Sequence, residues 1–317
     1  MEQDSQDLDN GGRHAPKFGI FHGLGIFIVA LAALYFAAAP IQRSLGMAGL
    51  AITEGLMLLI AVAACLLFHQ PLREVFPFRK PQGRHVAGTL LLWMGFFGIS
   101  IYITMVLSYF FPQDILEINK GMSSFMDEIP FLPQILIMAL LPAICEEMLF
   151  RGVIQYAFRK TNRWVIVSAV GLMFGICHMD PLRLLPTAIL GVGLALVMLK
   201  TRNMLLPMLY HFFNNFLSAL ISQLSGGVDM NAAASSLASL TPPMLLFMMI
   251  YAAASPLCLL LGGMLLDPRD ARHIAPRKWA PIVTIVTTAL LVIGTIVGFV
   301  MLFSSALETF PELPVYF

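Results

Sequence analysis

Long apolar runs, separated by short polar segments, follow one another along almost the whole chain. A helix that crosses the ~30 Å hydrocarbon core of a bilayer needs about 20 consecutive, mainly apolar residues. Nine runs approach this length, and they predict an all-α, polytopic membrane bundle of about nine transmembrane helices. The expected helices cover residues 18–40, 47–69, 86–111, 132–158, 164–180, 184–199, 203–224, 243–266 and 280–303.

The basic residues between these runs are alternately frequent and scarce. If the N-terminus is cytosolic, the inner segments carry 15 of the 19 lysines and arginines and the outer segments carry 3, while Arg151 alone lies inside a helix. Cytosolic loops of membrane proteins carry such an excess of positive charge. The alternation therefore predicts a cytosolic N-terminus and a C-terminus on the outer side.

The composition agrees with a membrane protein and excludes other classes. Apolar residues make up 58% of the chain and charged residues only 12%, against roughly 25% charged residues in soluble domains. The net charge is +1 and no basic domain stands out, which argues against a nucleic-acid partner. The four cysteines lie inside apolar runs without CxxC spacing, so we expect buried thiols rather than disulfides or a structural zinc cluster.

Three charges interrupt the fourth apolar run. Glu146 and Glu147 are adjacent, and Arg151 follows Glu147 by four residues on the same helical face, the order that favours an ion pair. Each acid costs about 2.5–3.5 kcal/mol inside a span, so both need a partner or a function. A buried ion pair that only fixes helix packing explains Glu147 and Arg151 but leaves Glu146 unexplained. Pro142 removes the backbone donor that the Met138 carbonyl would otherwise have.

Two further spans carry buried polar groups, each with a second motif residue one helical turn away. His178 shares a helical face with Phe174, and His211 shares one with Asn215, four residues away in each case. At a rise of ~1.5 Å per residue, Glu146 and both histidines fall between the cytosolic half and the middle of the membrane. We therefore expect them to form one site.

Two acids outside this set have simpler interpretations. Glu54 in the second span either faces the site or has a pairing or packing role. Asp180 precedes Pro181 and suits a helix end.

This set of side chains suits the hydrolysis of an amide bond inside the membrane. A carboxylate beside an imidazole can hold and deprotonate water, which assigns that role to Glu146 and His178. A histidine and an amide can donate hydrogen bonds to the oxyanion, which assigns His211 and Asn215. Glu147 and Arg151 would support them by positioning the helix and tuning Glu146.

Zinc is an alternative that the residues leave open. Glu146, His178 and His211 form a ligand set of the catalytic type, two histidines and a glutamate. The HExxH helix is absent, however, and the ligands would come from three helices. We therefore assign no cofactor from the residues.

Three segments resemble the motifs of a known family, in its order. EEMLFR at 146–151 matches EExxxR, FGICH at 174–178 matches FxxxH, and HFFNN at 211–215 matches HxxxN. The chain thus resembles the CPBP family of CAAX proteases and bacteriocin-processing enzymes, also called Abi or type II CAAX endopeptidases. The resemblance implies an intramembrane endopeptidase in which the first glutamate and the second motif's histidine activate water. The third motif's histidine and asparagine would stabilise the oxyanion. The family has been described both as metal-dependent and as glutamic.

The expected partners are membrane lipid and a peptide or protein substrate, lipidated or not, and we expect a multi-pass protein of a bacterial cell membrane. Two alternatives are a proton-coupled transporter and a catalytically silent immunity or scaffold protein of the same fold. The predicted organisation is a disordered cytosolic tail, N-terminal helices with an interfacial loop, a CPBP-like catalytic core and C-terminal helices, at residues 1–17, 18–129, 130–224 and 225–317. Within it, residues 112–131 alternate acidic and apolar side chains and predict an interfacial amphipathic segment. Residues 225–242 are small and polar and predict a flexible loop.

Overall fold

The computed structural model describes residues 18–127, 129–224, 235–236, 239–266 and 275–309. Within these ranges every regular element is a helix and there are no strands, which confirms the all-α prediction. The elements are α1 (Ile20–Ala33), the π-helix η1 (Leu34–Ala38), α2 (Ala39–Leu67), α3 (Leu72–Val75), α4 (Gly83–Phe110), α5 (Pro112–Asp127), α6 (Phe131–Gln134), η2 (Ile135–Leu140), α7 (Leu141–Glu147), η3 (Met148–Ile154), α8 (Gln155–Ala157), α9 (Arg163–Ile176), α10 (Pro181–Thr201), α11 (Leu205–Leu224), α13 (Pro242–Met248), α14 (Ile250–Ala253), α15 (Ser255–Leu266) and α17 (Ala275–Thr309).

Several helices meet the requirements for crossing a membrane. In the described part of the chain, six helical stretches are long and apolar enough, and α9 and α11 are shorter apolar helices. Many large apolar side chains point outward, among them Ile285 (67% exposed) and Phe299 (69% exposed) on α17, as a lipid environment requires. The chain is an integral, multi-pass membrane protein. The count of nine spans is not confirmed, and the cytosolic N-terminus stays a prediction.

The first stretch, Ile20–Leu67, is 48 residues long, and a straight helix of this length would reach about 72 Å, more than twice the thickness of the bilayer core. It bends back at Gly46, whose φ of 52° is accessible mainly to glycine. Across the bend, Gln42 donates a hydrogen bond to Thr53 at 2.9 Å, and α2 packs against η1 and α1. Its two arms follow the first two spans that the sequence predicts.

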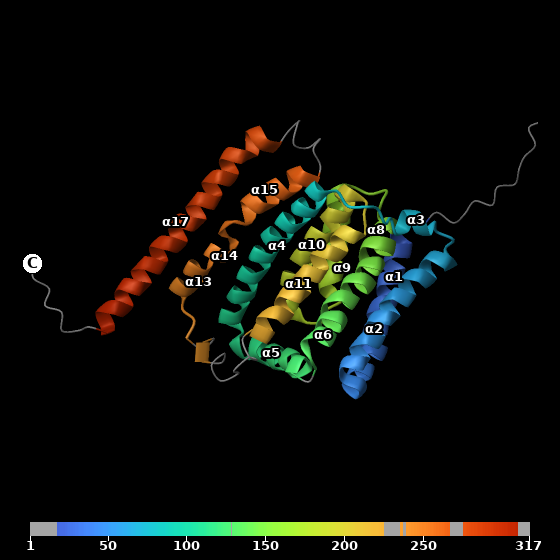
Figure 1. Ribbon diagram of the computed structural model, residues 1–317, viewed down its shortest axis with the longest axis horizontal. Coiled ribbons are helices and arrows are strands. Elements are labelled where there is room, and N and C mark those ends of the chain that lie inside the picture. Colours follow the sequence, from blue (N-terminus) through green and yellow to red (C-terminus); the bar gives the residue numbers. More distant parts are fainter. Residues whose placement is uncertain (1–17, 128, 225–234, 237–238, 267–274, 310–317) are drawn as a thin grey trace, which may run out of the picture.

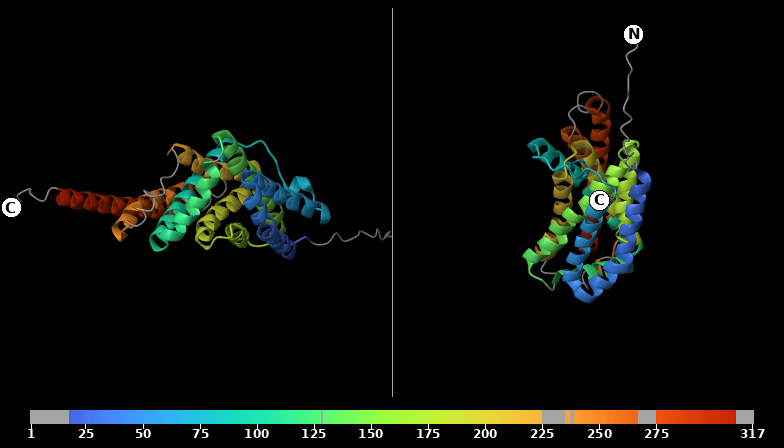
Figure 2. Two further views of the ribbon diagram at one scale, coloured as in Figure 1. Left: turned by 90° about the horizontal axis from the view of Figure 1, so that it is seen from below. Right: turned by 90° about the vertical axis from the view of Figure 1, so that its right-hand side faces the viewer.

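The remaining helices form a bundle around α10 (Figure 1). α9 and α10 are close neighbours, α4 packs against both α10 and α15, and α11 contacts α7 and η2. α17 lies along the edge made by α13, α14 and α15 (Figure 2), while α1 and α2 form the opposite edge. The polar motifs of the sequence therefore fall on the inner helices.

Several predicted segments can be compared only in part. The tail at residues 1–17 and most of the loop at 225–242 lie outside the described residues. The predicted amphipathic segment contains the helix α5, in which Ile115 and Leu116 are buried. Its position at a membrane surface stays a prediction. All four cysteines are free and buried, as expected.

Candidate active site

The span from Phe131 to Ala157 is helical throughout but irregular, because the π-helices η2 and η3 interrupt it on both sides of α7. Short π-helical stretches inside α-helices are frequent at functional sites. Glu146 and Glu147 end α7, and Arg151 lies in η3. The change of helical pitch directly after the two acids alters which side chains share a face of this span.

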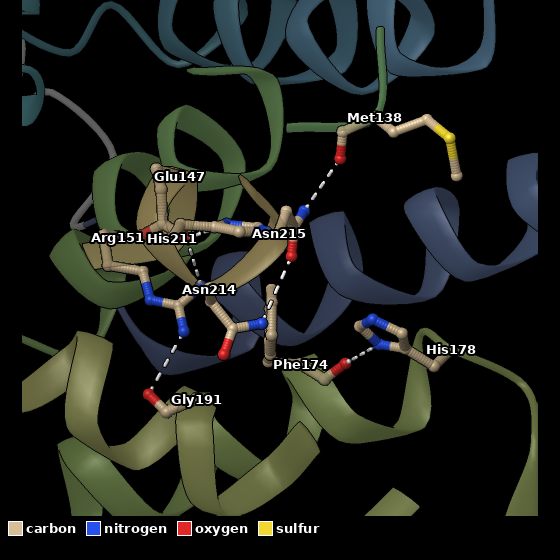
Figure 3. A network of polar contacts seen from close by, with 9 residues as sticks. All are labelled: Met138, Glu147, Arg151, Phe174, His178, Gly191, His211, Asn214 and Asn215. Atoms are coloured by element: carbon tan, nitrogen blue, oxygen red, sulfur yellow. Dashed lines mark hydrogen bonds and ion pairs between the residues drawn. The ribbon is translucent and has the colours of Figure 1, made fainter. Parts of the chain in front are cut away.

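Glu147 is the centre of a buried polar network that joins two spans (Figure 3). Its Oε1 atom lies 3.1 Å from Arg151 Nη1 and 2.8 Å from His211 Nδ1 on α11. The side chains of Glu147 and Arg151 are 0% exposed. The predicted ion pair is therefore present, and it has a histidine as its third member, which spacing within one helix does not reveal.

Arg151 has two further partners that the sequence analysis missed. Its Nη2 atom donates to the carbonyl of Gly191 on α10 at 3.1 Å, and its guanidinium lies 4.3 Å from the centre of the Phe174 ring. One turn later, Gln155 donates to the carbonyl of Ala195 at 3.0 Å. The arginine therefore ties the acid-bearing helix to α10, in addition to balancing Glu147.

His178 lies in the turn between α9 and α10. Its Nδ1 atom is 3.0 Å from the Phe174 carbonyl; because a carbonyl only accepts, Nδ1 carries the proton and Nε2 is left as an acceptor. Asp180 caps α10 by accepting from Leu182 N at 2.9 Å, which confirms the helix-end interpretation of this acid. The two helices approach so closely that a Cβ on Gly175 would lie 2.5 Å from the Leu184 carbonyl oxygen.

The Phe174 ring lies between the polar groups of all three motifs. Its centre is 5.2 Å from that of His178 and 5.6 Å from that of His211, both in edge-on arrangements, and Arg151 stands over its face. The structure thus brings the three motifs together around one aromatic ring. The expectation that the polar residues gather in one region of the bundle is met for these side chains.

Asn215 contacts the carbonyl that Pro142 leaves without its usual helical donor. The Asn215 Nδ2 atom donates to the Met138 carbonyl at 3.1 Å, and Asn215 Oδ1 accepts from Asn214 at 3.2 Å (Figure 3). One amide hydrogen of Asn215 is therefore used to hold η2 against α11, and the second remains for another acceptor.

Glu146 is half-buried and has a different environment from Glu147. Its carboxyl interacts electrostatically with His211 on α11 and Arg183 on α10. Glu54 on α2 lies close enough for a side-chain hydrogen bond with it. Glu54 is 7% exposed, so of the two interpretations of this acid the structure favours the one that faces the site. Among the described residues, the carboxylate–histidine hydrogen bond belongs to Glu147 and His211, not to Glu146 and His178.

A hollow of about 420 Å³ opens beside α7 and α11. Its walls are apolar and include Leu140, Ala143 and Ile144 from one span and Met208 and Phe212 from the other. It lies next to the helix that carries the two acids. The hollow suits an apolar group held near the polar network.

The residues that the zinc alternative requires do not form a metal centre. Among the described residues, no three His, Cys, Asp or Glu side chains converge in a set able to hold a metal ion. His178 and His211 each use Nδ1 in a hydrogen bond to another group, an arrangement that also orients metal-binding histidines, so these bonds do not distinguish the two mechanisms. In the described part of the chain, Glu146, His178 and His211 are not gathered as a set of zinc ligands.

Comparison with protein families places the three motifs in a single domain. Residues 128–217 match the family model described as Rce1-like, Type II CAAX prenyl endopeptidase Rce1-like. All six polar residues of the three motifs lie within this range. A search of curated proteins and a search of solved structures each found no match.

Proposed function

We propose, on the premise that this chain belongs to the CPBP family of CAAX-type intramembrane proteases, that it is a glutamic endopeptidase. It would cleave a peptide bond within the membrane by attack of an activated water molecule. The observation that carries the proposal is the coincidence of the matched domain with the buried network that joins Glu147, Arg151 and His211. Buried charges inside a membrane span are costly, and they mark functional sites by default.

Glu146 and His178 would hold and deprotonate the water. Glu146 is the less buried of the two acids and is not part of the Glu147 ion pair. Its carboxylate is available as a base when the proton of its hydrogen bond with Glu54 is carried by Glu54. The Nε2 atom of His178 is an acceptor, because Nδ1 donates to the Phe174 carbonyl. A water molecule held by these two acceptors can lose a proton to Glu146 as its oxygen attacks the substrate carbonyl, and the proton can then pass to the leaving amine.

His211 and Asn215 would stabilise the oxyanion. Because Nδ1 of His211 faces the Glu147 carboxylate at 2.8 Å, donation from Nε2 requires the doubly protonated ring, which this contact with the carboxylate favours. Asn215 has one amide hydrogen on the Met138 carbonyl and offers the other to the oxyanion. Glu147 and Arg151 are supporting residues that orient His211 and fix the helix.

The substrate of a protease family is a peptide or protein. The apolar hollow between α7 and α11 supports a substrate with an apolar segment or an attached lipid at the cleavage site. A bacterial cell membrane remains the proposed location.

Cleavage of a labelled peptide library by the purified protein tests the proposal. The Glu146→Gln variant should lose turnover while its melting temperature stays near that of the parent, because the isosteric amide keeps the packing and removes the base. Glu117→Gln, an exposed acid on α5, is the matched control and should retain full activity. Retained cleavage in Glu146→Gln would move the base elsewhere, and absence of cleavage in the parent would support the catalytically silent alternative.

The glutamic mechanism has its own test, separate from activity in the variants. Elemental analysis of the active enzyme should find no stoichiometric zinc, and chelators should leave turnover unchanged. One tightly held zinc per chain, with activity lost to chelator and restored by zinc, would overturn the oxyanion roles of His211 and Asn215.

A further inference from the structure

A second hollow lies far from the three motifs, at the end of the bundle where α4 begins and α10 ends (upper end in Figure 1). Its volume is about 840 Å³, twice that of the hollow beside α7. Four basic residues line it: Arg79, Arg163, Lys200 and Arg202. None of the described lining residues is acidic. Arg79 precedes α4, Arg163 begins α9, and Lys200 and Arg202 lie at the end of α10. The charge alternation assigns all four to the same side of the membrane.

The backbone around two of these cations is fixed by the fold. Asn203 is 4% exposed; its side chain accepts from Arg79 N at 3.2 Å and donates to Arg79 O at 3.0 Å. Met204 N donates to the Pro77 carbonyl at 2.9 Å. The segment before α4 is thus held against the turn between α10 and α11, next to Arg202. The backbone positions of Arg79 and Arg202 are therefore set before any ligand arrives, which reduces the entropic cost of binding.

Apart from Thr201, the rest of the lining is apolar. Leu196 on α10 and Leu259, Leu260 and Met264 on α15 form its walls, and Trp164 beside it is 61% exposed. Tryptophan is enriched at the membrane–water interface. A ligand that satisfies both parts has a negatively charged head and an apolar chain, as an anionic phospholipid does.

We propose that this hollow, lined by Arg79, Arg163, Lys200 and Arg202 above an apolar wall, is a binding site for an anionic phospholipid. The headgroup phosphate contacts the side chains of Arg79, Arg163 and Arg202, and an acyl chain lies along α15. These three arginines carry like charges around the hollow, and an anion offsets their repulsion. Basic hollows between transmembrane helices on the cytosolic side are known to bind acidic lipid headgroups.

Native mass spectrometry of the purified full chain in detergent tests this proposal, using phosphatidylglycerol and phosphatidylcholine as probes. The parent should retain phosphatidylglycerol in preference to phosphatidylcholine. The variant Arg79→Gln/Arg202→Gln should weaken retention by about 30-fold, since each basic side chain near an anionic lipid contributes roughly fivefold. The backbone contacts of Asn203 do not involve either side chain and should survive.

The matched control is Arg73→Gln/Arg84→Gln. It removes two exposed arginines from the same connection that do not line the hollow, and it should bind as the parent does. Equal loss in both double variants, with melting temperatures unchanged, would overturn the proposal, as would equal retention of phosphatidylcholine. Displacement of the lipid by millimolar inorganic phosphate would show that the hollow is a phosphate site and not a lipid site. Peptide cleavage is not the readout, so the result is independent of the proposed catalysis.

Discussion

Replacement of Glu147 should destabilise the protein, and a second replacement should reverse most of that loss. The side chains of Glu147 and Arg151 are both 0% exposed, and they lie 3.1 Å apart. Removing one partner of a buried pair leaves the other charge uncompensated and costs about 3–5 kcal/mol. Glu147→Leu should therefore lower the melting temperature in detergent by about 10 °C.

The variant Glu147→Leu/Arg151→Met removes both charges with side chains of similar volume. A buried ion pair replaced by apolar residues is often neutral or stabilising. The double variant should regain most of the lost stability. About 1–3 kcal/mol should remain lost, because the His211 nitrogen no longer has a hydrogen-bond acceptor. Thermal unfolding of the parent, both single variants and the double variant gives the interaction energy as a double-mutant cycle.

Peptide cleavage by the same four proteins separates stability from chemistry. Glu147 also binds His211 Nδ1 at 2.8 Å, so the double variant should remain inactive although it is folded. A double variant as unstable as Glu147→Leu would refute the view that the buried charge causes the loss. A double variant with restored cleavage would show that Glu147 does not orient His211.

Three further outcomes are expected. Asn215→Ala should lower turnover by roughly 10²–10³ through loss of an oxyanion donor. Adding Pro142→Ala, which restores a backbone N–H donor for the Met138 carbonyl, should not recover turnover; recovery would mean that Asn215 only holds the helix that carries Met138. Gly175→Ala should cost about 1–3 kcal/mol in thermal unfolding and lower turnover, since its Cβ would meet the α10 backbone, whereas Gly25→Ala, with nothing within 4 Å of its Cβ, should be neutral. Reporter fusions should find the C-terminal Phe317, which lies outside the described residues, on the outer side; a cytosolic reporter would contradict the nine-helix prediction.

The sequence alone was sufficient for the all-α fold class, and it indicated which polar residues to consider as a candidate site. Apolar runs long enough to cross a bilayer predict helices, because in lipid every backbone polar group must be satisfied within the segment. Charges inside such runs stand out because of their cost, and this is how Glu146, Glu147 and Arg151 were found. The i, i+4 spacing also predicted the ion pair between Glu147 and Arg151 correctly, since that geometry is a property of one helix.

Contacts between helices were decided by the tertiary structure. Nothing in the spacing of 146–151 indicates that Glu147, rather than Glu146, bonds to the histidine of α11, because the π-helix η3 and the packing of α7 on α11 set that orientation. The hydrogen bond from Arg151 to the Gly191 carbonyl, and the gathering of basic residues from separate parts of the chain around one hollow, also depend on how the helices pack. Periodicity reports which residues share a face of one helix, while the partner of that face depends on how the helices pack.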